Sequence, residues 1–163
     1  WPGTVKAGRR SDIPGISHDH FPTLLEIAGV RCPQEHDATV EGVSLVSLLQ
    51  GKDHSVDPQR ALFWHMPHFW GPRGPGIQPF SSIRKGPWKL IYYHHPQPQR
   101  VLFHLGQDVG EKTDVAAQQP QIRDQLSQLL GQHLRAVKAG LPRRNGTTIP
   151  YPDRMAESTK KPN

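Results

Sequence analysis

The sequence has 163 residues, which is enough for one ordinary domain or for part of a larger one and argues against two complete domains. Only 34% of the residues are hydrophobic, and 17 Pro and 15 Gly favour short elements, many turns and a thin core. The net charge of +6 is scattered along the chain, which argues against nucleic-acid binding, and no apolar run is long enough to cross a membrane or to form a signal peptide.

The first regular element that the sequence predicts is a helix over residues 21–28. Ser17 or Asp19 can cap its start, and Gly29 can end it. Apolar residues recur on one side of this helix and are predicted to be buried: Phe21, Leu24, Leu25 and Ala28. A short second helix is predicted over residues 43–50.

Short apolar segments after residue 60 predict β-strands. They lie at residues 61–65, 80–84, 88–94 and 100–105. A glycine between the second and third strands favours a hairpin. Apolar residues then recur at spacings of three and four between Pro120 and Val137, which predicts a helix that packs on the four-stranded sheet. From residue 143 onward the sequence is almost without apolar residues and is expected to form an extended tail.

Several short blocks of the sequence follow one another in a characteristic order. They are Trp1-Pro2-Gly3, residues 16–30 (ISHDHFPTLLEIAGV), 41–45 (EGVSL), 62–69 (LFWHMPHF), 82–91 (SIRKGPWKLI) and 102–116 (LFHLGQDVGEKTDVA). In this order they resemble the end of the catalytic domain and the small C-terminal subdomain of arylsulfatase-type enzymes, members of the sulfatase family within the alkaline-phosphatase-like superfamily. One such block alone is a weak signature, whereas the whole series makes the resemblance specific.

The resemblance implies an α+β chain in which the end of an α/β catalytic domain is followed by a small four-stranded antiparallel sheet packed on a C-terminal helix. Residues 1–58 are expected to be the end of the catalytic domain, residues 59–142 the subdomain with its helix, and residues 143–163 the tail. The missing N-terminal catalytic part of the same protein is then an expected partner. By resemblance, the parent protein is also expected to be periplasmic or secreted.

The resemblance further implies an enzyme that hydrolyses sulfate esters with a formylglycine nucleophile, made from Cys or Ser, beside a bound calcium ion. In the family these parts lie upstream of the Trp-Pro-Gly block. The only cysteine, Cys32, excludes an internal disulfide and does not fit the Cys-x-Pro-x-Arg pattern, because Pro33 comes one place too early and His36 replaces the arginine. Asp19 and Asp37 lack partner carboxylates for a calcium site. We therefore expect no catalytic or metal-binding residue in this chain, which alone should be inactive.

The residues expected to touch substrate lie in and after the first strand. The resemblance implies that the loop at the end of this strand, residues 65–79, lies at the mouth of the catalytic pocket, against a sulfated sugar or an aryl sulfate. His65 and His68 can donate hydrogen bonds to hydroxyl or sulfate oxygens, Trp64 offers a flat apolar face, and Arg73 carries positive charge. A histidine at the end of a buried strand is about as often hydrogen-bonded inside the fold, so a structural role for His65 stays open.

Three alternatives remain at this point. The parent enzyme could be a related phosphonate monoester hydrolase or phosphodiesterase, which shares the architecture. The chain could instead be a non-catalytic basic module that binds sulfated polymers, as its net charge of +6 allows. Pairs of histidines such as His18 and His20 suggest zinc, but three or four convergent ligands are required and no further ligands are apparent.

Overall fold

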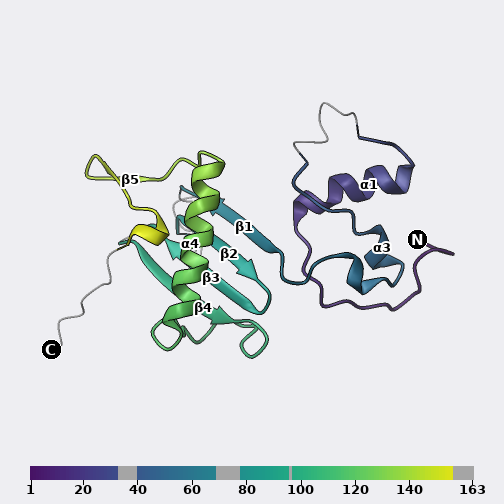
Figure 1. Ribbon diagram of the computed structural model, residues 1–163, viewed down its shortest axis with the longest axis horizontal. Helices are drawn as coiled ribbons and strands as arrows, with labels where there is room; N and C mark the ends of the chain where they lie inside the picture. Colours follow the sequence, from purple (N-terminus) through teal and green to yellow (C-terminus); the bar gives the residue numbers. More distant parts are fainter. Residues whose placement is uncertain (33–39, 69–77, 96, 156–163) are drawn as a thin grey trace. The chain divides into compact units, whose positions relative to one another are not determined.

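The chain folds into two compact units, residues 1–60 and residues 61–163. The computed structural model describes residues 1–32, 40–68, 78–95 and 97–155. Figure 1 shows the first unit in purple and blue, built from short helices and long connections, and the second unit as a sheet with one long helix across it. In the described residues no helix is both long and apolar enough to span a membrane.

In its described residues the N-terminal unit contains one regular helix, α1 (His20–Ala28), preceded by a 3-10 turn, η1 (Ser17–Asp19). Gly29 ends α1 with a φ of 66°, a left-handed conformation that glycine adopts without steric cost. The other elements are a single helical turn, α3 (Val46–Leu49), and a second 3-10 turn, η2 (Asp53–Ser55).

The burial of α1 differs from the prediction. Phe21 is 52% exposed and Leu24 is 63% exposed, and the residue of α1 that is buried is Thr23. The hydroxyl of Thr23 donates to the carbonyl of Asp19 and accepts the amide of Leu45 at 2.9 Å. The inward side of the helix is therefore fixed by hydrogen bonds to η1 and to the segment before α3, and the apolar stripe is left facing outward.

The C-terminal unit is built on a four-stranded sheet. The strands are β1 (Ala61–Met66), β2 (Phe80–Lys85), β3 (Trp88–Tyr93) and β4 (Gln99–His104), and each pairs antiparallel with the next in chain order. Gly86, at a φ of 55°, and Pro87 form the two-residue connection of the β2–β3 hairpin. This sheet confirms the predicted strands to within one residue at each end.

One face of the sheet is covered by α4 (Pro120–Ala136), as Figure 1 shows. The core between them consists of sheet residues and helix residues that are at most 3% exposed: Ile83, Leu90, Tyr92, Leu102, Leu126, Leu130 and Leu134. The structure thus confirms the predicted α+β arrangement of an antiparallel sheet packed on a helix.

Residues 143–155 differ from the expected extended tail. They form a small hairpin, β5 (Arg143–Arg144) and β6 (Thr147–Thr148), and a 3-10 turn, η3 (Pro152–Arg154). Ile149 is 6% exposed within the core, and the hydroxyl of Tyr92 donates to the carbonyl of Pro150. These few anchoring residues do not stand out in a segment of polar composition, so composition alone predicts a tail.

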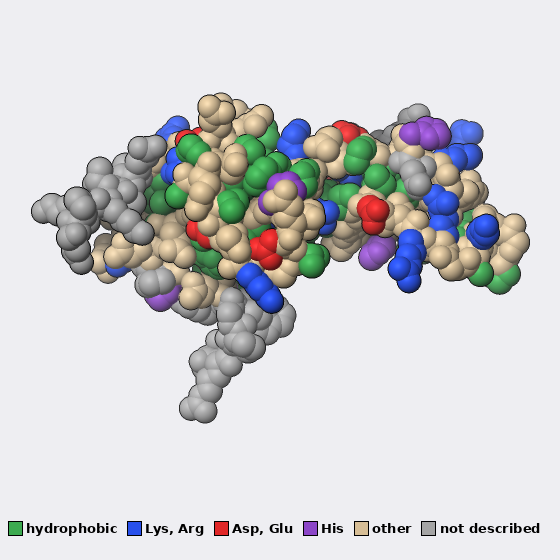
Figure 2. Space-filling model, turned by 90° about the horizontal axis from the view of Figure 1, so that it is seen from below, with side chains coloured by type: hydrophobic (Ala, Val, Ile, Leu, Met, Phe, Trp, Pro, Cys, Tyr) green, Lys and Arg blue, Asp and Glu red, His purple; other side chains and the backbone are tan. Residues whose placement is uncertain are grey.

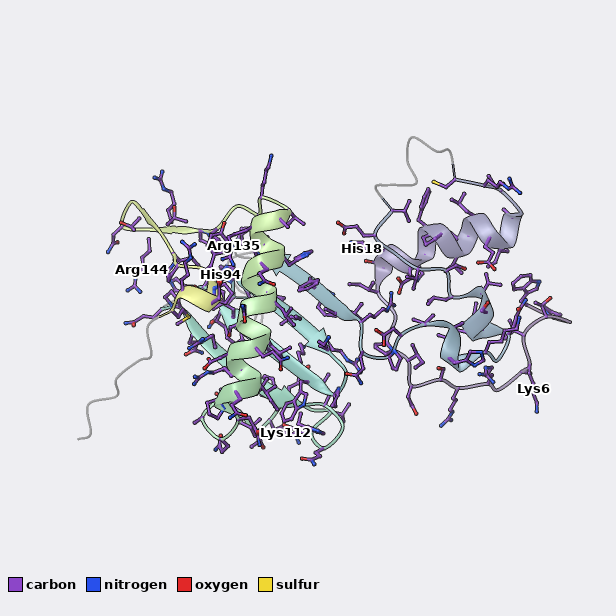
Figure 3. All side chains as sticks on the ribbon, in the orientation of Figure 1. Lys6, His18, His94, Lys112, Arg135 and Arg144 are labelled. Atoms are coloured by element: carbon purple, nitrogen blue, oxygen red, sulfur yellow. The ribbon has the colours of Figure 1, made fainter. Side chains whose placement is uncertain are left out.

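The turn η3 is held against α4 by an ion pair. Arg135 of α4, labelled in Figure 3, donates to both carboxylate oxygens of Asp153, at 3.0 and 2.7 Å. The pKa of Asp153 lies below its usual value chiefly because of these hydrogen bonds. The guanidinium also lies 5.0 Å from the ring centre of Tyr151, a cation–π contact.

Replacing Gly131 with Ala is expected to loosen this contact. A Cβ at residue 131 would lie 2.0 Å from Oδ1 of Asp153, so the carboxylate must shift and its ion pair with Arg135 is disturbed, even though alanine favours the helix itself. We expect the free energy of unfolding to fall by about 1–3 kcal/mol in chemical denaturation.

Gly140→Ala is the matched control, because a Cβ there has no heavy atom within 4 Å. It should change stability by less than about 0.5 kcal/mol. Equal stability of the two variants would show that η3 is not packed on α4 as described.

Candidate substrate-binding site

The predicted site begins on β1, whose side chains alternate between the two faces of the sheet. Phe63 lies on the face covered by α4, where its ring stacks on that of His133 with centroids 3.8 Å apart. His65 lies on the same face two residues on, and Trp64 lies on the other face, 38% exposed. Neighbouring residues of the predicted set therefore face different surroundings.

His65 makes hydrogen bonds through both ring nitrogens. Its Nδ1 lies 2.8 Å from Oγ of Ser81 on β2, and its Nε2 lies 3.1 Å from the carbonyl oxygen of Gly140, beyond the end of α4. Burial lowers the pKa of the imidazole; the hydrogen bond to Gly140 opposes this, and the nearby His68 adds to it. His65 is thus a neutral side chain bonded on both sides within its own unit.

A second histidine, His94, completes this cluster. Nε2 of His94 lies 3.0 Å from Oγ of Ser81, and the two imidazole rings lie 5.9 Å apart. Ser81 is fully buried and His94 is 3% exposed. Burial, and to a smaller extent His65, lowers the pKa of His94 to about 4. Figure 3 labels His94 within the C-terminal unit.

The sequence predicts His94 at the end of a strand, where with His95 it forms another histidine pair that suggests zinc, and it gives no signal for Ser81. The structure brings both to His65 because β1 pairs with β2 so that His65 lies opposite Ser81, and because the amide of His94 donates to the carbonyl of Pro79. The register of β1 against β2 across a long loop carries no sequence signal, so this grouping was not predictable.

The remaining predicted residues are placed differently. His68 is exposed, two residues beyond the end of β1. Arg73, together with Phe69 and Trp70, lies outside the described residues. Trp64 and His68 are therefore the predicted side chains that the described part of the chain leaves open to a ligand.

The described residues do not form a site that fits calcium. Within them, no group of three or more His, Cys, Asp or Glu side chains converges. Asp19 is fully buried, and its carboxylate accepts hydrogen bonds from the amides of Ile16 and Val43 and from Arg60. Cys32 is a half-buried free thiol, and Asp37 lies outside the described residues.

A cavity of about 380 Å³ lies between α4, β4 and η3, at the opposite edge of the sheet from β1. It is lined by Arg100, Asp124, Ser127, Gln128, Asp153 and Met155. Its charged groups have partners: Arg100 donates to Asp124 at 3.2 Å, and Asp153 accepts from Arg135 of α4. The cavity is consistent with the packing of η3 and offers no unpaired charge that the structure describes.

Comparison with known proteins gives the family. The family model described as N-sulphoglucosamine sulphohydrolase, C-terminal, matches residues 1–139. A protein named sulfatase from Formosa agariphila is 27% identical over 157 residues, which cover 85% of this chain and 26% of that protein. N-acetylgalactosamine-6-sulfatase from Homo sapiens is 27% identical over 166 residues, covering 89% of this chain and 31% of that enzyme.

Solved structures share the fold. A protein solved in complex with its substrate D-glucosamine-2-N,6-O-disulfate superimposes with a TM-score of 0.67 at 24% identity, covering 85% of this chain and 27% of that protein. The structure of Ps i-CgsB gives a TM-score of 0.61 at 20% identity, with 91% and 30% covered.

The chain spans between about a fifth and a third of the length of the curated relatives it matches. Its likeness to them runs through both units, since the family match extends from residue 1 to residue 139. The chain belongs to the family described as N-sulphoglucosamine sulphohydrolase, C-terminal, and corresponds to the C-terminal portion of a sulfatase.

Proposed function

We propose that this chain is the C-terminal part of a sulfuric ester hydrolase that acts on a sulfated sugar or an aryl sulfate. The family match over residues 1–139 carries this proposal. The names of the relatives, which include N-acetylgalactosamine-6-sulfatase and N-acetylglucosamine-6-O-sulfatase, favour an amino sugar sulfate over an aryl sulfate. A net charge of +6 also suits an anionic substrate.

The nucleophile and the metal ion belong to the rest of that enzyme in this proposal. Formylglycine, when present, supplies a hydrated aldehyde that attacks sulfur, and calcium balances the charge of the sulfate. The residues of this chain do not fit either group, since Cys32 lacks the required neighbours and the described carboxylates form no cluster. The role of this chain is accordingly to shape the pocket.

Within the pocket, Trp64 and His68 are the proposed direct contacts. The exposed indole of Trp64 suits the apolar face of a sugar ring, and the imidazole of His68 can donate to a hydroxyl or a sulfate oxygen. Arg73 is the proposed partner of the anion, at a position outside the described residues. His65 is bonded on both sides, so we assign it the role of holding the end of β1.

The N-terminal unit supports the same proposal through its exposed apolar side chains. The outward side of α1 and the residue that follows Gly29 present Phe21, Leu24, Ile27 and Val30, each at least 43% exposed. A protein of this size does not usually leave such a row in water. We propose that this row packs on the part of the sulfatase that the relatives have and that lies outside this chain.

Hydrogen exchange of the full chain tests this view of the N-terminal unit. We expect amides of α1 to exchange much faster than those of residues 122–136 in α4, because α1 has few buried contacts and α4 carries the core. Equal protection in the two helices would show that the N-terminal unit is stable without further packing.

Activity measurements test the function itself. The isolated chain, with calcium and a chromogenic aryl sulfate, should give no turnover above a blank, because it holds neither the nucleophile nor its metal. The protein encoded by the longest reading frame that includes this chain should release sulfate from N-acetylgalactosamine 6-sulfate or N-acetylglucosamine 6-sulfate. A reading frame that starts at Trp1 would overturn the proposal. So would an encoded protein that cleaves phosphonate esters in preference to sulfate esters.

The alternative of a basic module that binds sulfated polymers gains no support from the surface. On the face shown in Figure 2, the Lys and Arg side chains of each unit are interspersed with uncharged ones. Ion pairs also neutralise part of the charge of the C-terminal unit, including Lys89 with Glu111 and Arg135 with Asp153. Salt-dependent binding of the isolated chain to heparin would revive this alternative.

A further inference from the structure

The cluster of His65, Ser81 and His94 has hydrogen bonds whose direction can be derived. A carbonyl oxygen only accepts, so the bond between His65 and Gly140 requires a hydrogen on Nε2 of His65. In a neutral imidazole the other nitrogen is then an acceptor. Nδ1 of His65 therefore accepts the hydroxyl hydrogen of Ser81.

This assignment fixes the last bond. A serine hydroxyl has one hydrogen, and Ser81 gives it to His65, so its oxygen must accept from Nε2 of His94. Nδ1 of His94 is left as a bare acceptor, and it is indeed buried without a hydrogen-bond partner among the described residues. The opposite direction would place an unbonded N–H at that buried position, which is the costlier arrangement.

We propose that His94, Ser81 and His65 form a one-way chain of hydrogen bonds that ends on the carbonyl of Gly140 and holds the end of β1. These hydrogen bonds run from His94, the residue after β3, through Ser81 on β2 and His65 on β1. They end at the segment that follows α4. Each member occupies one tautomer or rotamer. Rotation of His65 or Ser81 would break two of these bonds, and rotation of His94 would break one.

The position of this chain of hydrogen bonds gives it a role in substrate binding, a step that rests on the proposed function. His65 is followed after two residues by His68, the proposed direct contact, whose side chain is exposed. Fixing the imidazole of His65 therefore also fixes the position of the nearby backbone that carries His68. His65, Ser81 and His94 are positioning residues in this scheme and do not touch the substrate.

Nitrogen-15 NMR of the histidine rings in the full chain at pH 7.5 tests the direction of the bonds. We expect both His65 and His94 to show a protonated Nε2 and an unprotonated Nδ1. A protonated Nδ1 on His94, or a cationic ring at either residue, would overturn the proposal. This readout does not depend on hydrolysis, so it fails or succeeds independently of the sulfatase assay.

Two serines on the same strand provide a matched pair of variants. Ser81 is fully buried and Ser82 is 1% exposed, but Ser82 lies on the opposite face of the sheet. In Ser81→Ala we expect the ring nitrogen shifts of His65 and His94 to change and the amides of Met66 and His68 to exchange at least about tenfold faster. Ser82→Ala should leave all of these unchanged, and equal effects of the two variants would refute the positioning role.

A second pair of variants, at residue 94, covers the case in which Ser81→Ala does not fold. His94→Gln keeps an N–H donor in reach of Ser81, whereas His94→Leu removes it. We expect His94→Gln to retain the His65 ring shifts of the wild-type chain and His94→Leu to lose them. Loss in both variants, or in neither, would contradict the donor assignment.

Discussion

Replacing Asp19 with Ala is expected to unfold the N-terminal unit while leaving the C-terminal unit folded. The carboxylate of Asp19 is fully buried and connects three segments of the chain. It accepts the amide of Ile16 at 2.9 Å, the amide of Val43 at 3.0 Å, and two hydrogen bonds from the guanidinium of Arg60. It therefore joins the start of α1, the segment before α3 and the end of the unit.

The size of the effect follows from what the substitution leaves behind. Without the carboxylate, the side chain of Arg60, only 15% exposed, keeps its bond to the carbonyl of Pro14 but loses its counter-charge. Removing one partner of a buried ion pair costs about 3–5 kcal/mol. A unit of about 60 residues with few buried apolar side chains has little more stability than that.

Asp12→Ala is the control, because Asp12 lies in the same unit and is exposed. Hydrogen exchange of the amides of Ile16, Val43 and Leu45 reports on the N-terminal unit, and that of α4 reports on the other unit. We expect Asp19→Ala to remove protection from the first set alone, whereas Asp12→Ala changes neither. Retained protection of Val43 in Asp19→Ala would show that the ion pair is dispensable.

Asp19 also makes the N-terminal unit sensitive to strong acid. Burial alone would raise the pKa of this carboxyl, but the hydrogen bonds from Arg60, Ile16 and Val43 and the charge of Arg60 outweigh burial and bring the pKa to about 2. Because the folded pKa lies below the unfolded value of 3.8, the contribution of Asp19 is complete above pH 4 and is lost as the pH falls toward 2.

The sequence allowed the C-terminal unit to be predicted well, for identifiable reasons. The strands carry short apolar runs bounded by turn residues, and the spacing of Leu126, Leu130 and Leu134 is typical of a helix with one buried face. Both signals are local, and packing of the helix on the sheet satisfies them within the unit. The physical environment of each element is therefore present in the chain itself.

The N-terminal unit was predicted less well because local pattern and available packing disagree there. The apolar stripe of α1 predicted burial of Phe21 and Leu24, but both side chains are exposed, and the residues buried at this helix are Thr23 and Asp19. The expected cap function of Asp19 is likewise replaced, since its side chain makes no cap bond to α1 and bonds instead to Arg60 and Val43. Contacts across some forty residues leave no periodic signal.

The candidate site lies between these two cases. The resemblance drew attention to Trp64, His65 and His68, but the partners of His65 come from β2 and from beyond α4. The sequence can suggest that a histidine is functional or structural, and only the register of the strands decides which of its nitrogens are already bonded. Both ring nitrogens of His65 are already bonded, so the proposed ligand contacts are Trp64 and His68 instead.

Lowering the pH from 6.5 to 4 is expected to destabilise the C-terminal unit through His94. Burial, followed by the neighbouring His65, lowers the pKa of His94 to about 4, whereas the unfolded chain takes up the proton at 6.5. Between these values the unfolded state binds more protons than the folded state, so the free energy of unfolding falls as the pH falls. This difference between the folded and the unfolded pKa corresponds to a loss in the free energy of unfolding on the order of 3 kcal/mol for one buried histidine.

The geometry explains why the folded unit resists the proton. Nδ1 of His94 has no described hydrogen-bond partner, and the titratable rings that contact the His94 ring are those of His65 and Tyr92, with centroids 5.9 Å and 5.2 Å away. His65 also has a lowered pKa and adds to the effect in the same direction. Neither neighbour supplies negative charge that would stabilise an imidazolium.

Urea denaturation of the C-terminal unit at a series of pH values measures this loss. His94→Gln cannot titrate and keeps a donor toward Ser81, so its stability should depend much less on pH between 6.5 and 4 than that of the wild-type chain. His20→Gln, at an exposed position in the other unit, is the control and should retain the full dependence. A slope in His94→Gln equal to that of the wild type would exclude His94 as the titrating group and would place the acid sensitivity of the unit elsewhere.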